Sequence, residues 1–304
     1  MLRYFTALAV ALLVMPQDSA AQSRDRIGYG RLITNDYFGD GHDRLRTGSF
    51  SSSRVWGPAW DGVLPPTFGD IIELRLGAEI IMPANNRKLL PGDRPYVGLL
   101  TAGLHTHFRQ GGMDIALGSD VVVTGPQTRL DDLQNSFHEQ FSIPTVSDRV
   151  REAQIGDAVH LSAVAEVGRN LALGNAATLR PFAEARGGVE NLVRIGFDVT
   201  LNDIMRDELL VRDPVTGQRY RTTPGNRGGL AFVFGGDIAY VDSSIYFPAS
   251  AGSVPLDRRE RWRVGLHWQA GLAKLFYGLT YLGEEYEGQP EGQVTGSLRL
   301  DFRF

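Results

Sequence analysis

Apolar and polar residues alternate along much of the chain, most sharply in the segment 294–304. From Val294 to Phe304 every second residue is apolar or glycine, and the residues between them are polar or charged. A repeat of two residues is the pattern of a β-strand whose two faces meet different surroundings. Residues 69–82 and 260–272 show the same repeat with larger apolar side chains. The pattern therefore predicts an all-β protein.

The same repeat recurs at regular spacing and predicts many long strands. Twelve segments fit it: 26–36, 44–55, 70–82, 95–108, 113–124, 154–171, 177–189, 191–202, 229–242, 259–272, 274–285 and 293–304. A soluble β-sandwich also alternates, but its strands average about five or six residues. Most of these segments reach about eleven residues or more, the length that a tilted membrane-spanning strand needs. A terminal aromatic such as Phe304 is also typical of bacterial outer-membrane barrels, so we predict an antiparallel, up-and-down transmembrane β-barrel of twelve strands.

The first residues of the chain predict export. Arg3 precedes an apolar stretch over 7–15, which is too short to span a bilayer, and small residues follow at 19–21. This is the pattern of a signal peptide over residues 1–21, the alternative being an uncleaved membrane anchor. Residues 22–304 are then expected to form a single outer-membrane barrel domain.

Composition narrows the class further. The chain has no cysteine, so disulfides do not hold it together. No apolar run after residue 21 is long enough for a transmembrane helix. The formal net charge of -4 argues against a nucleic-acid-binding protein. The 36 glycines suit a sheet protein with many tight turns.

An even number of strands places both chain ends on the periplasmic side and assigns every connection to one side of the membrane. The outward connections then include 37–43, 83–94, 125–153, 243–258 and 286–292. Two inward connections, 56–69 and 203–228, are long, although inward turns are usually short. The charged face of the last strand, with Arg299, Asp301 and Arg303, is expected to line a polar lumen. Aromatic side chains are expected at the two membrane interfaces: Trp56, Trp60, Trp262, Trp268, Tyr277 and Tyr281.

Three of the outward connections carry polar motifs that a purely structural barrel would not need. The motifs are Asn35-Asp36 with Asp43 and Thr47, then Asn86-Arg87-Lys88 before Gly92-Asp93-Arg94, then Gly125-Pro126 before Leu133-Gln134-Asn135 and His138. Because outward connections share one end of a barrel, we expect these motifs to converge in space. In this order, over residues 33–138, they resemble the outer-membrane lipid A 3'-O-deacylase family. The remaining strands match the plan of a twelve-stranded barrel.

The resemblance implies a calcium-dependent esterase that removes the 3'-linked acyloxyacyl chain from lipid A in the outer leaflet. It assigns catalytic roles to Asn35, Asp36, Thr47 and His138, and substrate binding to Arg87, Lys88, Arg94 and Gln134. It also implies that Asn35 and Asp36 hold the Ca²⁺ ion. The expected partner is lipid A or lipopolysaccharide, and the barrel is expected to be a monomer.

The chemistry of the residues agrees with this assignment. Ester hydrolysis needs a base that activates water, since the chain has no Gly-x-Ser-x-Gly elbow. An imidazole titrates in the right range for such a base, and besides His42, His138 is the only histidine of the outward cluster. A hard cation held by oxygen ligands can stabilise the oxyanion, and Thr47 can donate a hydrogen bond there. Arg87 can bind phosphate as a fork, and Lys88 as a point charge.

Each motif also has an ordinary structural interpretation. Asn35 and Asp36 are turn formers, Thr47 can be a lumen-facing strand residue, His138 a polar loop residue, and Arg87 with Lys88 a solvated charge pair. Asn35 and Asp36 are adjacent, so both can serve one site only if the strand ends or bulges there. Asp40, His42 and Asp43 have metal-like spacing, but Gly39-Asp40-Gly41 favours a turn. His105 and His107 share one strand face and are expected to line the lumen.

The sequence departs from the family in two places. The glutamate that the family places a few residues beyond the histidine has no counterpart, because Ile143 stands there. Glu139 and Asp148 are the acidic residues that could replace it. The basic cluster begins with Asn86 instead of a lysine. Both departures bear on the substrate and the efficiency of the reaction.

Two other functions remain open from the residues. An outer-membrane phospholipase would use Ser136 with His138, although two residues is a poor spacing for a loop dyad. A passive pore or structural barrel would need none of the motifs, and a long outward segment such as 125–153 could fold inward and constrict it.

Overall fold

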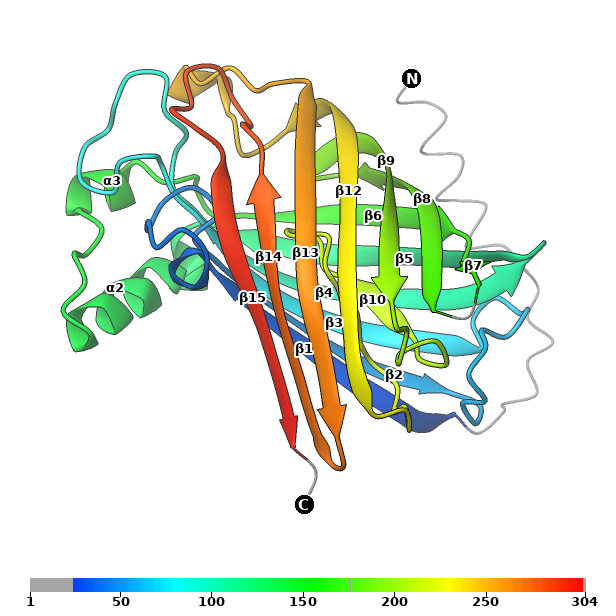
Figure 1. Cartoon of the computed structure of the whole chain (residues 1–304). Helices are drawn as coiled ribbons and strands as arrows, with labels where there is room; N and C mark the ends of the chain where they lie inside the picture. The colour runs from blue at the N-terminus through cyan, green and yellow to red at the C-terminus, as the bar shows by residue number, and fades with distance from the viewer. Residues whose placement is uncertain (1–23, 175, 303–304) are drawn as a thin grey trace, which may run out of the picture.

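The protein folds into a closed antiparallel β-barrel (Figure 1). The computed structural model describes residues 24–174 and 176–302, so the predicted signal peptide, Arg303 and Phe304 lie outside the described residues. The long strands are β1 Asp25–Asn35, β2 Gly48–Gly57, β3 Ile71–Ile81, β4 Val97–Gln110, β5 Met113–Thr124, β6 Ala158–Gly168, β8 Ala177–Gly187, β9 Glu190–Leu201, β12 Gly229–Ser244, β13 Arg258–Ala270, β14 Ala273–Leu282 and β15 Gln293–Phe302. Each lies within a few residues of a predicted strand, so the twelve-stranded barrel is confirmed.

Hydrogen bonding runs around the barrel without a break. β1 pairs with β15, which joins the first strand to the last, and β6 pairs with β8 past the short strand β7 (Leu171–Leu173). At the β1–β15 seam the hydroxyl oxygens of Thr34 and Ser297 lie 2.8 Å apart. Closure leaves the barrel without an exposed strand edge along this seam, as a membrane-embedded sheet requires.

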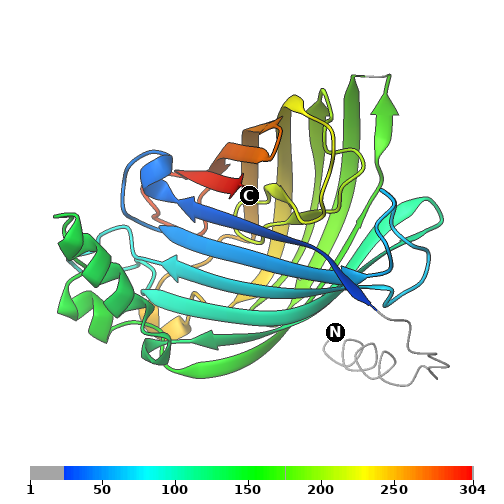
Figure 2. The same ribbon diagram turned by 90° about the horizontal axis from the view of Figure 1, so that it is seen from below.

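The helices lie beyond one end of the barrel. Figure 2 shows α2 (Leu130–Gln140) and α3 (Asp148–Glu152) together, outside the ring of strands. Two short 3₁₀ helices, η2 (Pro126–Thr128) and η3 (Ala249–Ala251), lie in outward connections. Among the described residues, no helix combines the length and the apolar character needed to cross a bilayer. The segment 125–153 therefore forms helices beside the barrel and does not fold into its lumen.

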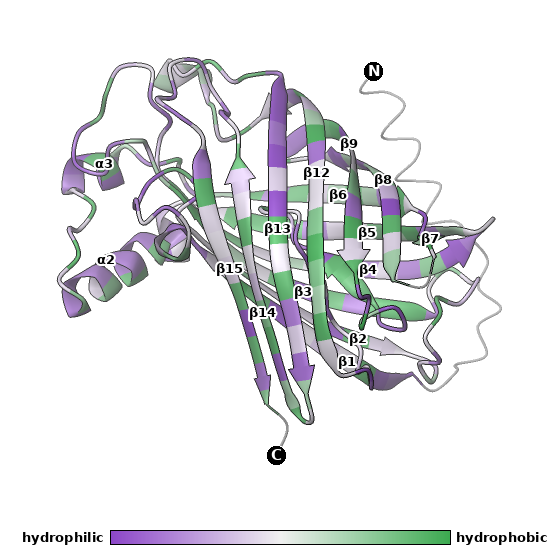
Figure 3. Ribbon diagram, viewed as in Figure 1, coloured by the Kyte–Doolittle hydropathy of each residue, from purple (hydrophilic) through white to green (hydrophobic). Residues whose placement is uncertain are grey.

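The two faces of the wall differ in polarity, and bands of opposite hydropathy alternate along the strands in Figure 3. On the outside, Val159 and Leu161 of β6 and Val193 and Ile195 of β9 are all more than half exposed. The inward side chains include the buried Glu73, His105, His107, Arg299 and Asp301. The expected lumen positions of the two histidines and of Arg299 and Asp301 are therefore confirmed. An apolar exterior around a polar interior is the pattern of a membrane barrel.

The expected interfacial aromatics do not all lie alike. Trp262, Trp268, Tyr277 and Tyr281 lie on β13 and β14 and are exposed. The indole N–H of Trp60 instead donates to the carbonyl of Asp207 at 2.8 Å. Its ring packs on a buried cluster that contains residues of the connection 203–228. Trp60 therefore holds an inner connection in place.

The long connection 203–228 folds back into the barrel, and we call it the lumen insert. It contains a hairpin of β10 (Leu210–Arg212) and β11 (Arg219–Arg221), which pair with each other as a separate small sheet. Thr216, Tyr220 and Arg221 of the insert are buried. The segment is long because it fills the lumen, which the two-residue repeat of the wall does not reveal.

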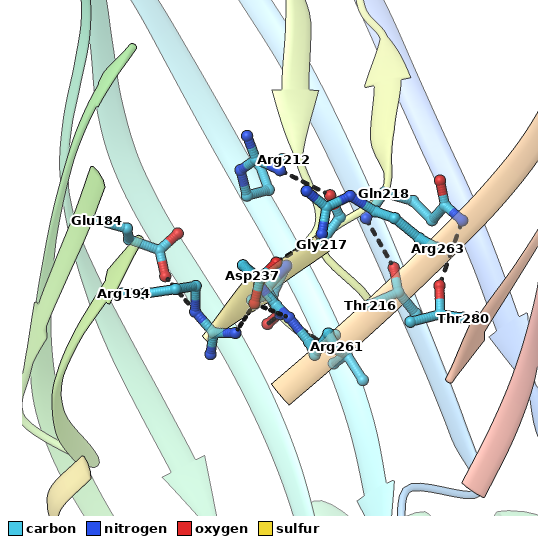
Figure 4. A network of polar contacts seen from close by, with 12 residues as sticks. Glu184, Arg194, Arg212, Thr216, Gly217, Gln218, Asp237, Arg261, Arg263 and Thr280 are labelled. Carbon is cyan, nitrogen blue, oxygen red and sulfur yellow. Dashed lines mark hydrogen bonds and ion pairs between the residues drawn. The ribbon is translucent and has the colours of Figure 1, made fainter. Parts of the chain in front are cut away.

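Polar and charged side chains of the inner wall bind the lumen insert, and Figure 4 shows one such contact, between Gln218 of the insert and Thr280 of the wall. Nε of Arg212 donates to Glu166 at 2.6 Å, and its Nη2 donates to Asp198 at 2.8 Å. On another part of the wall, the hydroxyl of Ser51 donates to Asp213 at 2.7 Å. Buried ions need such partners because an unpaired charge away from water is strongly destabilising. The insert and the wall therefore neutralise each other.

Asp237 of β12 is the centre of the wall's ion network. It accepts hydrogen bonds from Arg261 Nε at 2.9 Å and from Arg263 Nη1 at 2.5 Å, and it also pairs with Arg194. The insert passes beside this cluster at Gly217, which has φ of +71°. A Cβ at Gly217 would lie 2.9 Å from Arg261 Nη2, so the turn needs glycine for both conformation and space.

Replacing Asp237 with asparagine should destabilise the barrel. The change leaves three guanidinium groups without their shared anion, and breaking a buried pair from one side costs about 3–5 kcal/mol. We expect the barrel to lose its compact, fast-migrating form at a lower temperature in a heat-modifiability gel. Glu287→Gln, which removes an exposed outward carboxylate, is the control. Equal transition temperatures for the two variants would contradict this role of Asp237.

Candidate functional site

The first motif gathers where β1 ends. The strand stops at Asn35, whose Oδ1 accepts a hydrogen bond from the Tyr37 amide at 2.9 Å and caps the short 3₁₀ helix η1 (Asp36–Phe38). The amide of Asp36 donates to the carbonyl of Thr47 at 3.0 Å, which closes the connection on itself. The strand therefore ends between Asn35 and Asp36, which is the condition for both residues to serve one site.

Asp36 is a buried carboxyl group. It is 2% exposed, and its Oδ2 accepts from the main-chain N–H of Arg44 at 3.0 Å. Burial raises the pKa of Asp36 to about 8; the Arg44 amide opposes this shift and the negative charge of Asp43 adds to it. A carboxylate in this environment is costly to ionise alone, so the position favours a neighbouring cation.

Asp43 connects the first motif to α2. Its Oδ1 accepts from the hydroxyl of Thr47 at 2.6 Å and from Nε2 of Gln134 at 3.4 Å. The hydroxyl of Tyr96 donates to the other end of Gln134, its Oε1, at 3.1 Å. The second oxygen, Oδ2, is buried without a hydrogen bond and lies 3.4 Å from Nε2 of His138. Asp43 is thus held by one oxygen and presents the other to the imidazole.

His138 is oriented by the main chain that follows its helix. Nδ1 lies 2.9 Å from the carbonyl oxygen of Pro144. A carbonyl only accepts, so Nδ1 carries the proton and Nε2 keeps the lone pair in the neutral ring. The amide of Asn135 holds this segment through two hydrogen bonds with the main chain of Val146, at 3.1 and 2.9 Å. His138 is buried, so Nε2 is aimed at Asp43.

The family's supporting glutamate has no acidic replacement here. Ile143 stands at its expected position, and the next residue, Pro144, provides the oxygen that Nδ1 contacts. Of the two acidic candidates, Glu139 is exposed on α2. The side chain of Asp148 is 89% exposed and lies 3.8 Å from Arg151. Within the described residues, the ion-pair contact of His138 is with Asp43.

The expected substrate-binding cations have two different environments. Arg87 and Lys88 are exposed on an outward connection that Asn85 organises, its Oδ1 accepting from their amides at 3.0 and 2.9 Å. Arg94 is 1% exposed and is paired with Glu285. Arg87 and Lys88 are therefore accessible to a ligand, whereas Arg94 is engaged inside the protein.

Side-chain contacts also decide between the interpretations of His42 as a metal ligand or turn residue and of Ser136 as a partner of His138. His42 is exposed, and its amide donates to the side chain of Asp40 at 3.0 Å, which fits a turn. The hydroxyl of Ser136 donates to the carbonyl of Asp132 at 2.8 Å, within its own helix. Ser136 is therefore not engaged with His138, and the geometry does not form a serine–histidine pair.

The oxygen donors of the site fit a hard cation. Among the described residues, no three His, Cys, Asp or Glu side chains are grouped as a metal site. The donors are instead two carboxylates, Asp36 and Asp43, and one carboxylate oxygen has no hydrogen bond. Calcium accepts carboxylate, amide and main-chain oxygens alike. Asn35 and Asp36, the ligands that the resemblance implies, therefore bring an amide and a carboxylate oxygen of this kind to the site beside Asp43.

The sequence did not assign a catalytic or binding role to three residues of this arrangement: Asp43, Tyr96 and Pro144. Asp43 belongs to the first motif, and its spacing from Thr47 was the available signal. Tyr96 contacts the site only through Gln134, and Pro144 only through its main-chain oxygen. Neither contact leaves a recognisable pattern in the chain.

The fold and the site define a bacterial outer-membrane β-barrel that gathers titratable side chains at its outer rim. A sequence profile of the family described as "Outer membrane protein LpxR" matches residues 5–304. The chain belongs to this family. It is therefore an outer-membrane protein of lipid A remodelling, and membership implies lipid A deacylase activity.

Several solved structures align with this chain at low sequence identity. LpxR from Salmonella typhimurium aligns with a TM-score of 0.74 and 17% identity, over 91% of this chain and 100% of that chain. The β domain of the Bordetella autotransporter BrkA aligns with a TM-score of 0.43 and 10% identity, over 92% and 100%. The translocator domain of NalP from Neisseria meningitidis aligns with 0.39 and 9%, over 99% and 94%. No match is found among curated protein sequences.

Proposed function

We propose that this protein hydrolyses the ester that joins the 3'-linked acyloxyacyl chain to lipid A, with His138 as the base that activates water. One observation carries the proposal. The Pro144 carbonyl fixes the proton of His138 on Nδ1 and leaves Nε2 beside Asp43 at the outer rim. A general base needs an unprotonated nitrogen within reach of the reacting water. Family membership supplies the class of substrate.

The proton movements follow from this geometry. Nε2 of His138 takes a proton from water, and the resulting hydroxide attacks the ester carbonyl. The imidazolium then has one N–H on the Pro144 carbonyl and the other facing Asp43 Oδ2, whose negative charge stabilises it. The proton passes to the sugar oxygen as its bond to the acyl carbon breaks. The products are the acyloxyacyl fatty acid and a lipid A with a free hydroxyl.

The remaining residues of the site position these groups. The hydroxyl of Thr47 and the amide of Gln134 both hold Asp43 Oδ1, so Oδ2 stays directed at the ring. Asn35 caps η1 and thereby places Asp36. A calcium ion held by Asn35 and Asp36 would supply positive charge to the developing oxyanion.

Substrate binding is proposed for the exposed cations. Arg87 and Lys88 lie on the outward connection next to the site's own, where the phosphates of lipid A are reached. Arg94 is left out of this role because Glu285 already neutralises it. A monomeric barrel over 22–304, exported by a signal peptide at 1–21, completes the proposal.

Replacing His138 with alanine should abolish most of the activity. In a strain with unmodified lipid A, we expect the wild-type protein to remove one acyloxyacyl chain from each lipid A molecule that it hydrolyses. His138→Ala should slow the reaction by about a hundredfold or more, because general-base catalysis contributes roughly 10²–10⁴-fold. Mass spectrometry of extracted lipid A measures the change.

Ser136→Ala is the control for His138→Ala, because that hydroxyl bonds only within the helix. Unchanged lipid A in cells that contain the folded wild-type barrel and sufficient calcium would refute the deacylase. Release of fatty acid from labelled phosphatidylethanolamine would then favour the phospholipase.

Replacing Asp43 with asparagine keeps the shape of the side chain and removes its charge. We expect kcat to fall by at least about tenfold, because the imidazolium loses its counter-charge. The new amide N–H can also donate a hydrogen bond to Nε2 and block its lone pair. Initial rates on purified lipid A measure this. Asp148→Asn removes the exposed acidic candidate and should keep the wild-type rate. Equal losses in both variants would contradict a role particular to Asp43.

Calcium dependence is expected from the oxygen ligands that Asn35 and Asp36 offer. A chelator should abolish the wild-type activity, and added Ca²⁺ should restore it. Asp36→Asn removes one anionic ligand, so it should raise the Ca²⁺ concentration that gives half-maximal activity by about tenfold or more. Glu139→Gln, on the exposed side of α2, should leave this concentration unchanged. Wild-type activity that persists in excess chelator would exclude the ion from the reaction.

A further inference from the structure

The helix that holds His138 has an exposed apolar flank. Leu133, Phe137 and Phe141 follow one another at four-residue intervals along and just past α2, and they are 63%, 57% and 61% exposed. The rings of Phe137 and Phe141 pack together with centroids 4.5 Å apart. We call these three residues the apolar flank. An ordered apolar stripe of this kind on a surface helix indicates contact with another apolar phase.

The other sides of α2 have different surroundings. Gln134 and His138 are buried toward the site. Because successive residues of a helix turn by about 100°, Asp132 and Glu139 lie on the side roughly opposite the apolar flank. Both are exposed. Asp132 also pairs with Arg129 and Arg151. α2 therefore has a site-facing side, an apolar side and a charged side, as a helix in the plane of an interface has.

The site itself is continuous with the lipid-facing wall. The hydroxyl of Tyr277, on the outside of β14, donates to the carbonyl of Phe38 at 2.8 Å. Phe38 belongs to η1, whose first residue is Asp36, and Tyr37 and Phe38 are both exposed. The apolar surface of the barrel therefore reaches the edge of the site from the β14 side.

The cationic connection that carries Arg87 and Lys88 lies beside the helical segment of α2 and α3. The hydroxyl of Ser147, at the start of α3, donates to the carbonyl of Arg87 at 3.0 Å and joins the cationic connection to the helical segment. Leu89 and Leu90 are exposed directly after Lys88. Cations followed by apolar side chains fit the level of a lipid at which its phosphates give way to its acyl chains.

We propose that α2 lies in the outer leaflet, with its apolar flank in contact with the acyl chains of the lipids that surround the barrel. The charged side, with Asp132 and Glu139, then faces the headgroups and water. The inference deepens the proposed function, because an ester of lipid A lies at the depth where sugar and acyl chain meet. The helix would hold His138 at that depth, so the bond need not leave the membrane.

Labelling at single cysteines tests the depth of the helix without any reaction. The chain has no cysteine, so Phe137→Cys and Glu139→Cys each give one labelling position for a bimane fluorophore. Purified protein is placed in phosphatidylcholine vesicles that contain lipids with a nitroxide on the acyl chain. We expect the label at 137 to be quenched several-fold more by the nitroxide lipid than the label at 139. Iodide in the water should give the reverse order.

Equal quenching at the two positions, or iodide quenching that is greater at 137, would overturn the proposal. These vesicles contain no lipid A, so quenching at 137 that appears only after lipid A is added would assign the flank to the substrate and also overturn it. Leu133→Cys and Phe141→Cys replace Phe137→Cys if that variant does not give the heat-modifiable folded band.

A second measurement connects the helix to the reaction. Phe137→Ser with Phe141→Ser should lower the ratio of the rate on lipid A in vesicles to the rate on lipid A in detergent micelles by about tenfold. An unchanged ratio would contradict the membrane role. If the wild-type protein shows no deacylation, the proposed function fails while the quenching result still decides the position of α2.

Discussion

The barrel depends on charge balance among the buried side chains of its lumen. Its outer wall meets lipid, so the charged side chains face inward, and each buried guanidinium needs a carboxylate. Arg263 pairs with Asp198 at 2.6 Å, and Arg261 with Asp237 at 2.9 Å. The lumen insert belongs to the same network, since its Arg212 shares Asp198 with the wall. The insert therefore contributes to the stability of the barrel, because it supplies partners for charged groups of the wall.

The same balance extends to the outer rim and fixes the site. Arg46, which directly precedes Thr47, pairs with Glu285 at 2.7 Å and with Glu79 at 2.5 Å. Burial alone would raise the pKa of Glu285, but Arg46, Arg94 and Arg259 lower it well below its usual range. Glu285 is therefore ionised and holds the connection between β1 and β2 against the barrel. The position of Asp43 in front of His138 follows from this anchoring.

The strands of the wall could be predicted from the sequence, because a strand between lipid and lumen must alternate apolar and polar residues along its whole length. The sequence also grouped the outward motifs correctly on one rim, since strand order alone decides which connections share an end. It could not separate Arg87 from Arg94, because the partner of Arg94 is Glu285, far along the chain. The lumen insert was equally hidden, since its stability comes from ion pairs with distant strands rather than from a local repeat.

The bond between His138 and the main-chain oxygen of Pro144 has an evolutionary consequence. A carboxylate that orients a histidine is lost by a single substitution, whereas a peptide carbonyl is present whatever the residue. Orientation then depends on the path of the backbone, which Asn135 holds through Val146. This contact sets no requirement on the side chains at 143 and 144, so conservation of residue type at those two positions is a poor guide to function.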